Sequence, residues 1–167
     1  MSNNIPESGM KFISENTYHI EKSQLYELVR SDGVQTVEFI RAIDDKLLFV
    51  EAKTTFANPY NPSPGNLEKF QKEIEDICEK FIHSLYLFSA VKTGATEFVF
   101  PDDFTLPDKV SLTLILVIKK HESGWCRAPE QALKDALPPC FVKIWKPAVH
   151  VINEEIAVEE GIAAFSA

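Results

Sequence analysis

The sequence predicts an α/β domain in which a central mixed β-sheet is flanked by helices. Three observations carry this prediction. Two runs, 34–43 and 46–55, are rich in β-branched and aromatic residues and are separated by a single Asp-Asp pair. The segment 67–90 repeats apolar residues at the three-and-four spacing of an amphipathic helix. The run 110–119 is almost wholly apolar, as a strand buried on both faces would be.

The composition is that of one globular domain: 167 residues, of which 45% are apolar and 25% charged. We expect a single domain over 1–167, with a loose lead-in over 1–17 and an acidic tail over 154–167. The three cysteines form no CxxC pair, which argues against a disulfide framework and a zinc site. This cysteine usage, a start without signal-peptide pattern, and the lack of a roughly 20-residue apolar span predict a cytoplasmic protein away from membranes.

The N-terminal part of the chain is expected to hold a short strand over 11–14, inside the lead-in, and one short helix. Ser23 is a favourable N-cap residue, so the helix is expected over 24–30. The turn that follows contains Gly33, which can adopt the positive φ that commonly ends a helix.

The two strand-like runs are joined by so short a turn that they must form an antiparallel hairpin. The segment 58–66 then holds three prolines and a glycine, which predicts a loop. Because a helix follows at once, we expect this loop to flank the functional site. The long helix over 67–90 comes next, and Gly94 is expected to close it.

The C-terminal half is expected to complete the sheet. The sequence predicts a short strand over 97–100, the buried strand over 110–119, and a helix over 129–137 that begins at a proline. It also predicts strands over 140–146 and 149–153, because both runs are rich in β-branched and aromatic residues.

Three charged residues of the hairpin are the candidates for chemistry: Glu38 on its first strand, and Glu51 and Lys53 on its second. Side chains alternate along a strand, so Glu51 and Lys53 share one face. Folding at the Asp-Asp turn brings Glu38 back beside that pair. A register shift of one residue would place Glu38 on the opposite face.

Two carboxylates and one ammonium group in this arrangement suit a divalent metal. Hard oxygen ligands favour Mg²⁺ or Mn²⁺, and such ions stabilise charge on a phosphodiester and lower the pKa of bound water. The lysine would orient or deprotonate the attacking water, or neutralise the developing charge. The four histidines, by contrast, match no metal-ligand spacing.

The pattern resembles the core of the PD-(D/E)xK nuclease superfamily, which includes restriction endonucleases, Holliday-junction resolvases and repair nucleases. The match covers roughly 20–90, where an acid, a turn and the apolar-apolar-Glu-x-Lys run at 49–53 follow one another. The resemblance implies a restriction endonuclease-like core and metal-dependent hydrolysis of DNA or RNA. It implies metal-binding roles for Glu38 and Glu51 and a catalytic role for Lys53.

Many members of the superfamily also carry an acid on or beside the first helix. Glu21 and Glu27 both lie there, and Glu21 is the preferred third metal ligand. The first acid of the hairpin is Glu38, whereas the superfamily usually has Asp, so metal geometry would have to adjust to a longer side chain. Because many members dimerise, the resemblance also leaves a homodimer open.

Other interpretations stay open. Glu51 and Lys53 could be an ordinary solvated pair, which contributes little to stability. The chain could be a catalytically inactive nuclease-like fold that serves as a binding or assembly module. It could also be an α/β domain with an unrelated small-molecule pocket.

The charge balance bears on the nucleic-acid prediction. The net charge is −8, and phosphate contacts need lysine and arginine. The tail over 151–167 carries four acids and no base, while the stretch 109–146 carries seven bases against three acids. The basic stretch 109–146 could form one face that binds nucleic acid. Alternatively, its lysines could only solvate exposed strand and helix faces.

Overall fold

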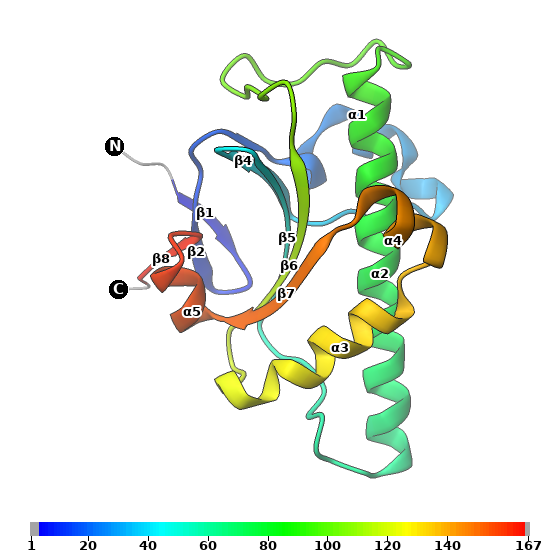
Figure 1. Ribbon diagram of the computed structural model, residues 1–167, viewed down its shortest axis with the longest axis vertical. Coiled ribbons are helices and arrows are strands. Elements are labelled where there is room, and N and C mark those ends of the chain that lie inside the picture. The colour runs from blue at the N-terminus through cyan, green and yellow to red at the C-terminus, as the bar shows by residue number, and fades with distance from the viewer. Residues whose placement is uncertain (1–3, 166–167) are drawn as a thin grey trace.

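The computed structural model describes residues 4–165, which form three layers (Figure 1). The middle layer confirms the predicted α/β class, because it is a five-stranded mixed sheet of order β3-β4-β5-β6-β7. Its strands are β3 (Thr17–Tyr18), β4 (Phe39–Ile43), β5 (Lys46–Lys53), β6 (Ser111–Ile118) and β7 (Ala148–Asn153).

Helices cover one face of this sheet and a small second sheet covers the other (Figure 1). The helical layer contains α2 (Pro64–Lys92), α3 (Arg127–Ala136) and α4 (Pro139–Trp145), and α1 (Gln24–Val29) adds Leu25 to the same core. The opposite layer is a three-stranded sheet with one helix: β1 (Asn4–Glu7), β2 (Met10–Ile13), β8 (Ala163–Ala164) and α5 (Glu154–Glu159). Short 3-10 helices lie at η1 (Ile20–Lys22), η2 (Arg30–Asp32) and η3 (Ser123–Trp125).

The predicted hairpin is present as β4 and β5, which pair antiparallel from Phe39↔Val50 to Ile43↔Lys46. Asp44 takes the tight turn with a φ of 52°. From β5 onward the sheet is parallel, since β5 pairs with β6 and β6 with β7 in the same direction. The carboxyl ends of three strands therefore meet at one edge, where ligands commonly bind in open α/β sheets.

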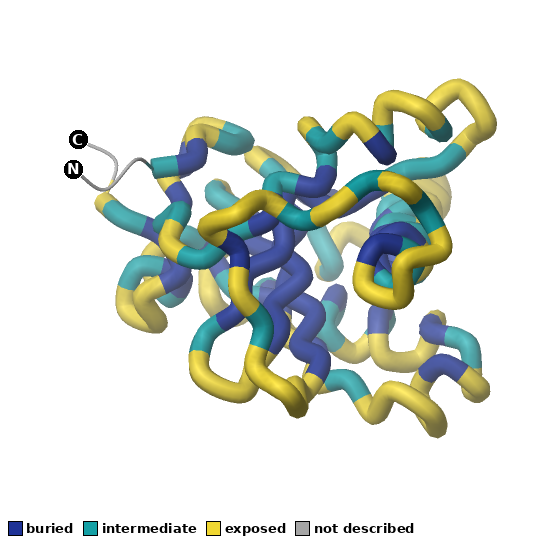
Figure 2. The backbone as a smooth tube through the Cα atoms, turned by 90° about the horizontal axis from the view of Figure 1, so that it is seen from above, coloured by how far each residue is buried: buried dark blue, intermediate teal, exposed yellow. Residues whose placement is uncertain are grey.

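Strand β5 contributes to two separate cores because its side chains alternate. Leu47 and Phe49 face the helical layer, whereas Leu48 and Val50 face the small sheet. Figure 2 shows the resulting buried centre as dark blue tube enclosed by exposed yellow segments. The next two helix-facing positions of β5 are Glu51 and Lys53, the predicted acid and lysine. Two charged side chains therefore follow directly after buried apolar ones on the same face of the strand.

The long helix was correctly predicted, although α2 starts three residues earlier, at Pro64, and ends two later, at Lys92. A proline at the first helical position costs no hydrogen bond. Gly94 follows with a φ of 72°, as expected for the closing residue. The predicted apolar stripe is buried from Ile74 to Phe88, whereas Leu67 at its start is exposed and Phe70 is partly buried. The buried residues of α2 are Ile74, Ile77, Cys78, Phe81, Ser84, Leu85, Leu87, Phe88 and Val91.

The N-cap prediction for the first helix is confirmed, because the Ser23 hydroxyl accepts a hydrogen bond from the Tyr26 amide at 3.1 Å. Replacing Ser23 by Ala is expected to lower the free energy of unfolding by about 1 kcal/mol, since that amide loses its acceptor. Chemical denaturation measures the change. Ser31→Ala, at an exposed neighbouring position, is the matched control and is expected to change it by less than about 0.5 kcal/mol.

Two strand predictions in the C-terminal half are wrong. The run 140–146 forms α4, which starts at Pro139 and buries only Phe141. The run 97–100 forms no strand, although Phe98 and Phe100 pack against the core. In the run 97–100 the aromatic residues pack against the core without joining a strand. In α4 the β-branched residues Val142 and Ile144 are exposed, so neither strand pairing nor burial accounts for them.

Residues 4–17 and 154–165 contain more regular structure than the sequence suggested, while residues 1–3 and 166–167 of the predicted lead-in and tail lie outside the described residues. The expected loose lead-in over 1–17 contains β1, β2 and the start of β3, and the expected acidic tail over 154–167 contains α5 and β8. These segments find one another across the chain, because β2 pairs with β8 through Lys11↔Ala164 and Phe12↔Ala163. The strand predicted over 34–43 begins only at Phe39.

A side chain accepts a hydrogen bond from one backbone amide on the outer edge of β7. Glu130 of α3 accepts a hydrogen bond from the Val151 amide at 3.0 Å, and the same carboxylate accepts one from Lys134 at 3.1 Å. These hydrogen bonds hold the pKa of Glu130 below its usual range, although burial acts in the opposite direction.

The length and apolarity that a bilayer-spanning helix needs are found in none of the helices over 4–165.

Candidate functional site

The structure brings the hairpin acids together as the predicted register requires. Glu51 and Lys53 lie at the carboxyl end of β5 on the helix-facing side. Glu38 lies one residue before β4, just beyond the last ladder pair Phe39↔Val50. Its amide donates to the Val50 carbonyl at 3.1 Å, which fixes Glu38 beside the strand that carries Glu51.

Glu51 is the most deeply placed of these side chains, with an exposed fraction of 0%. Its Oε1 accepts a hydrogen bond from Lys80 Nζ of α2 at 2.6 Å, and Lys53 Nζ lies 3.9 Å from the same oxygen. Its Oε2 is buried and has no hydrogen-bond partner within the described part of the chain. One oxygen therefore faces two ammonium groups and the other remains available.

Glu38 is also buried, at 8% exposed, and its Oε2 likewise lacks a partner among residues 4–165. Burial, a hydrogen bond with Glu21 and repulsion from Glu51 raise the pKa of Glu38 to about 9. A hydrogen bond between two carboxyl groups requires one proton. At neutral pH the pair of Glu38 and Glu21 therefore holds a proton where a cation would otherwise balance its charge.

The pKa values of Glu51 and Lys80, which contact each other, are both raised, with opposite effects on their charged forms. Burial raises the pKa of Glu51, and the ammonium groups of Lys80 and Lys53 oppose that rise without cancelling it. Burial lowers the pKa of Lys80, but attraction to Glu51, Glu38 and Glu21 outweighs it and raises the pKa overall. The field at this edge is thus dominated by carboxylates, and Lys80 is held protonated by them.

Of the two candidate acids near the first helix, the structure joins only one to the site. Glu21 lies on η1 and contacts Glu38. Glu27 lies on α1 and instead forms an exposed ion pair with Arg30, with an N–O distance of 3.2 Å. The preference for Glu21 over Glu27 agrees with this placement.

Glu21 also belongs to a second group of possible ligands, with Glu7 and His19. One ligand atom of each lies within 4.8 Å of the other two, so these residues could hold a metal ion. His19 Nε2 and Glu7 Oε1 are 3.4 Å apart. Burial and the Lys22 ammonium lower the pKa of His19 despite the neighbouring carboxylates, which favours the neutral imidazole that binds metals.

Glu7, His19 and Lys80 were not among the site residues predicted from the sequence. Glu7 reaches the site only because β1 pairs within the small sheet, and the histidines considered alone showed no ligand spacing. Lys80 did leave a signal: it stands three residues after Ile77 and four before Ser84, both buried. A lysine at that spacing within an apolar stripe indicates a buried counter-charge.

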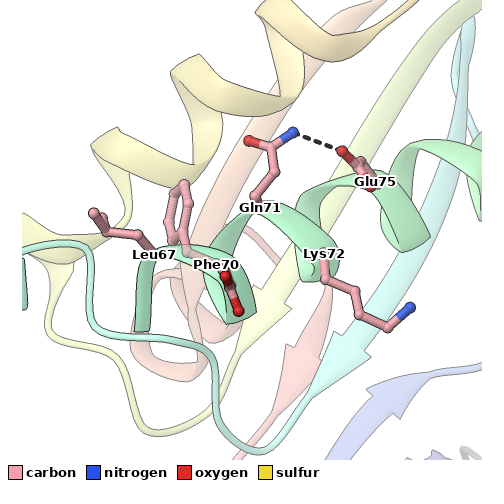
Figure 3. Close-up of a pocket in the computed structure, with 6 residues that line it drawn as sticks. Leu67, Phe70, Gln71, Lys72 and Glu75 are labelled. Carbon is pink, nitrogen blue, oxygen red and sulfur yellow. Dashed lines mark hydrogen bonds between the residues drawn. The ribbon is translucent and has the colours of Figure 1, made fainter. Parts of the chain in front are cut away.

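A hollow of about 620 Å³ lies elsewhere, over the first turns of α2 (Figure 3). None of the carboxylates described above lines it. Gln71 and Glu75 hydrogen-bond to each other across it at 2.9 Å, which satisfies its most polar groups internally. Its lining residues are Leu67, Glu68, Phe70, Gln71, Lys72 and Glu75.

Comparison with known proteins adds no relative: no family model, no curated protein and no solved structure matches this chain.

Proposed function

We propose that this protein is a metal-dependent nuclease of the PD-(D/E)xK type, which hydrolyses phosphodiester bonds in DNA or RNA. One observation carries the proposal: Glu21, Glu38 and Glu51 converge at the carboxyl edge of the sheet with Lys53 beside them. The order of helix, antiparallel hairpin, long helix and parallel strand supports a restriction endonuclease-like core.

The residues present fit a hard divalent cation such as Mg²⁺ or Mn²⁺. Two buried carboxylate oxygens, Oε2 of Glu38 and Oε2 of Glu51, lack a hydrogen-bond donor within 4–165. Unpartnered buried oxygens are costly, and a cation that takes one or two carboxylates is the partner they lack. When bound, such an ion would supply Lewis-acid stabilisation of phosphoryl charge and a more acidic water.

The protein's own groups divide the remaining work. Lys53 has 34% of its side chain exposed and lies at the mouth of the site, where it can contact a phosphate and orient the attacking water. Lys80 is 17% exposed and contacts Glu51 at 2.6 Å, so it positions that carboxylate. Attack by water breaks the bond between phosphorus and the leaving sugar oxygen.

A second candidate function is favoured by the same Lys80 contact. An ammonium group 2.6 Å from Glu51 Oε1 occupies space in which a cation would be expected, and the chain has a net charge of −8. Both features fit a nuclease-like fold that has lost hydrolysis and serves as a binding or assembly module. The two functions differ in whether the site turns over substrate.

The experiment that tests the proposal compares two lysines of β5. Plasmid DNA, single-stranded DNA and single-stranded RNA are incubated with the protein and Mg²⁺ or Mn²⁺. Wild type is expected to cleave at least one of them, and Lys53→Met is expected to reduce the rate by about 10²–10⁴-fold. Lys46→Met, exposed at the other end of the strand, is the matched control and should cleave normally.

The contrary result is also specific. If wild type binds the metal yet cleaves none of the three substrates, the proposal fails and the binding or assembly module becomes the function. If Lys53→Met and Lys46→Met cleave at equal rates, the activity does not come from this site.

A further inference from the structure

We propose that Glu7, His19 and Glu21 form a second metal site, one that binds a first-row transition-metal dication such as Zn²⁺ or Co²⁺ in preference to Mg²⁺. It lies next to the pair of Glu38 and Glu51 and shares Glu21 with it. The proposal goes beyond the nuclease function, because its ligands include a nitrogen and it stands whether or not the chain cleaves nucleic acid.

The spacing of the ligand atoms supports a metal rather than a hydrogen-bonded cluster. His19 Nε2 and Glu7 Oε1 are 3.4 Å apart, which is long for a hydrogen bond. It is close to the roughly 3.3 Å that separates two ligands of a tetrahedral ion bound at about 2.05 Å. The third ligand atom, from Glu21, lies within 4.8 Å of both.

Two buried polar atoms of this region have no hydrogen-bond partner within residues 4–165. His19 Nε2 is buried, and its nearest charged neighbour is Glu7 Oε1 at 3.4 Å, a distance that gives no well-formed hydrogen bond. Behind Glu21 lies Glu38, more than nine-tenths buried, with its Oε2 also unpartnered and its carboxyl group in contact with Glu21.

The choice of ion follows from the donor set. Mg²⁺ prefers oxygen ligands only, whereas imidazole suits zinc, cobalt and their neighbours. One imidazole and two carboxylates leave one tetrahedral position open for water, the arrangement of catalytic rather than structural zinc sites. Lys22, 3.6 Å from Glu7 Oε1, is the competing cation, but its side chain is 62% exposed and can move into solvent.

The backbone around the site is held in place by contacts that do not involve the ligands. Glu7 ends β1, and the turn after it is tied to the end of β5. The Ser8 hydroxyl donates to the Ala52 carbonyl at 3.0 Å, and the Thr54 hydroxyl donates to the Ser8 carbonyl at 3.1 Å. The small sheet therefore presents a ligand to the same edge of the main sheet that holds the nuclease-type acids.

The test is Zn²⁺ binding by calorimetry and Co²⁺ binding by visible absorption, in a Cys140→Ser background that removes an exposed thiol. Wild type is expected to bind one Zn²⁺ at this site, and its Co²⁺ form to show d–d bands of low coordination number. His19→Ala and Glu7→Gln are each expected to weaken Zn²⁺ binding by more than about 100-fold. His150→Ala, at an exposed histidine of β7, is the control and should bind normally.

A third variant separates this proposal from the nuclease proposal. Glu51→Gln removes a ligand of the first site only, so Zn²⁺ binding should persist in it. Zn²⁺ affinity unchanged in both His19→Ala and Glu7→Gln would overturn the second site, whatever the first site does. Loss of Zn²⁺ binding in Glu51→Gln with retention in His19→Ala would overturn it equally and assign the ion to Glu38 and Glu51.

Discussion

Glu51→Gln is expected to abolish Mg²⁺ and Mn²⁺ binding at the nuclease-type site and to lower the free energy of unfolding by about 3 kcal/mol. Removing one partner of a buried ion pair leaves the other charge without compensation, at a cost of about 3–5 kcal/mol. The lower figure applies because Glu38 and Glu21 also attract the Lys80 ammonium. Calorimetric titration measures the first effect, and urea denaturation without metal measures the second.

The double variant Glu51→Gln/Lys80→Met separates folding from metal binding. It removes both charges, so its stability should return to within about 1 kcal/mol of wild type. Metal binding should not return, because the ligand is still missing. Metal binding at wild-type affinity by this stable double variant would show that Glu51 is no ligand.

The second large effect is a loss of stability of the metal-free protein as pH rises. Glu38 has a pKa of about 9 in the folded protein against an ordinary value of 4.5. Between these values the folded state keeps a proton that the unfolded state has released. The contribution of Glu38 to stability is therefore fully present below about pH 4.5. As the pH rises from about 4.5 to about 9, the free energy of unfolding falls by about 1.4 kcal/mol per pH unit.

Glu38→Gln isolates this contribution, because glutamine has similar shape and does not titrate. Both proteins are denatured with urea at several pH values from 5 to 9, with a chelator present. The free energy of unfolding should fall more steeply with pH for wild type, and the difference in slope should correspond to the release of close to one proton. Glu27→Gln, on the exposed ion pair of α1, should follow wild type. Parallel stability curves for wild type and Glu38→Gln would mean that Glu38 is ionised in the folded protein.

Local sequence patterns were enough to predict the hairpin, the acids on its strands and the long helix. A two-residue turn fixes the register of its two strands, so the relation of Glu38 to Glu51 was contained within 14 consecutive residues. The apolar spacing of α2 likewise depends only on the helix itself. In such segments the sequence neighbours are also the structural neighbours.

The parts that escaped prediction depend on pairing across the whole chain. Strands β1, β2 and β8 have two to four residues each, too few to produce a periodic signal, and β8 follows β2 by about 150 positions. Glu7 joins the site only through that sheet. The strand prediction over 140–146, where the structure has α4, failed for another reason. Its β-branched residues Val142 and Ile144 are exposed, so they reflect neither strand pairing nor burial.

The hydrogen bond from the Val151 amide to Glu130 has a consequence for how this chain can associate with other chains. Strand β7 forms one edge of the five-stranded sheet, and an open edge is a template for strand addition and aggregation. Here one of its donors is already taken by a carboxylate from a helix that lies alongside. An incoming strand would have to displace that side chain and accept its negative charge, so this edge is protected against sheet extension. If two copies of the chain do associate, the interface is expected on another surface.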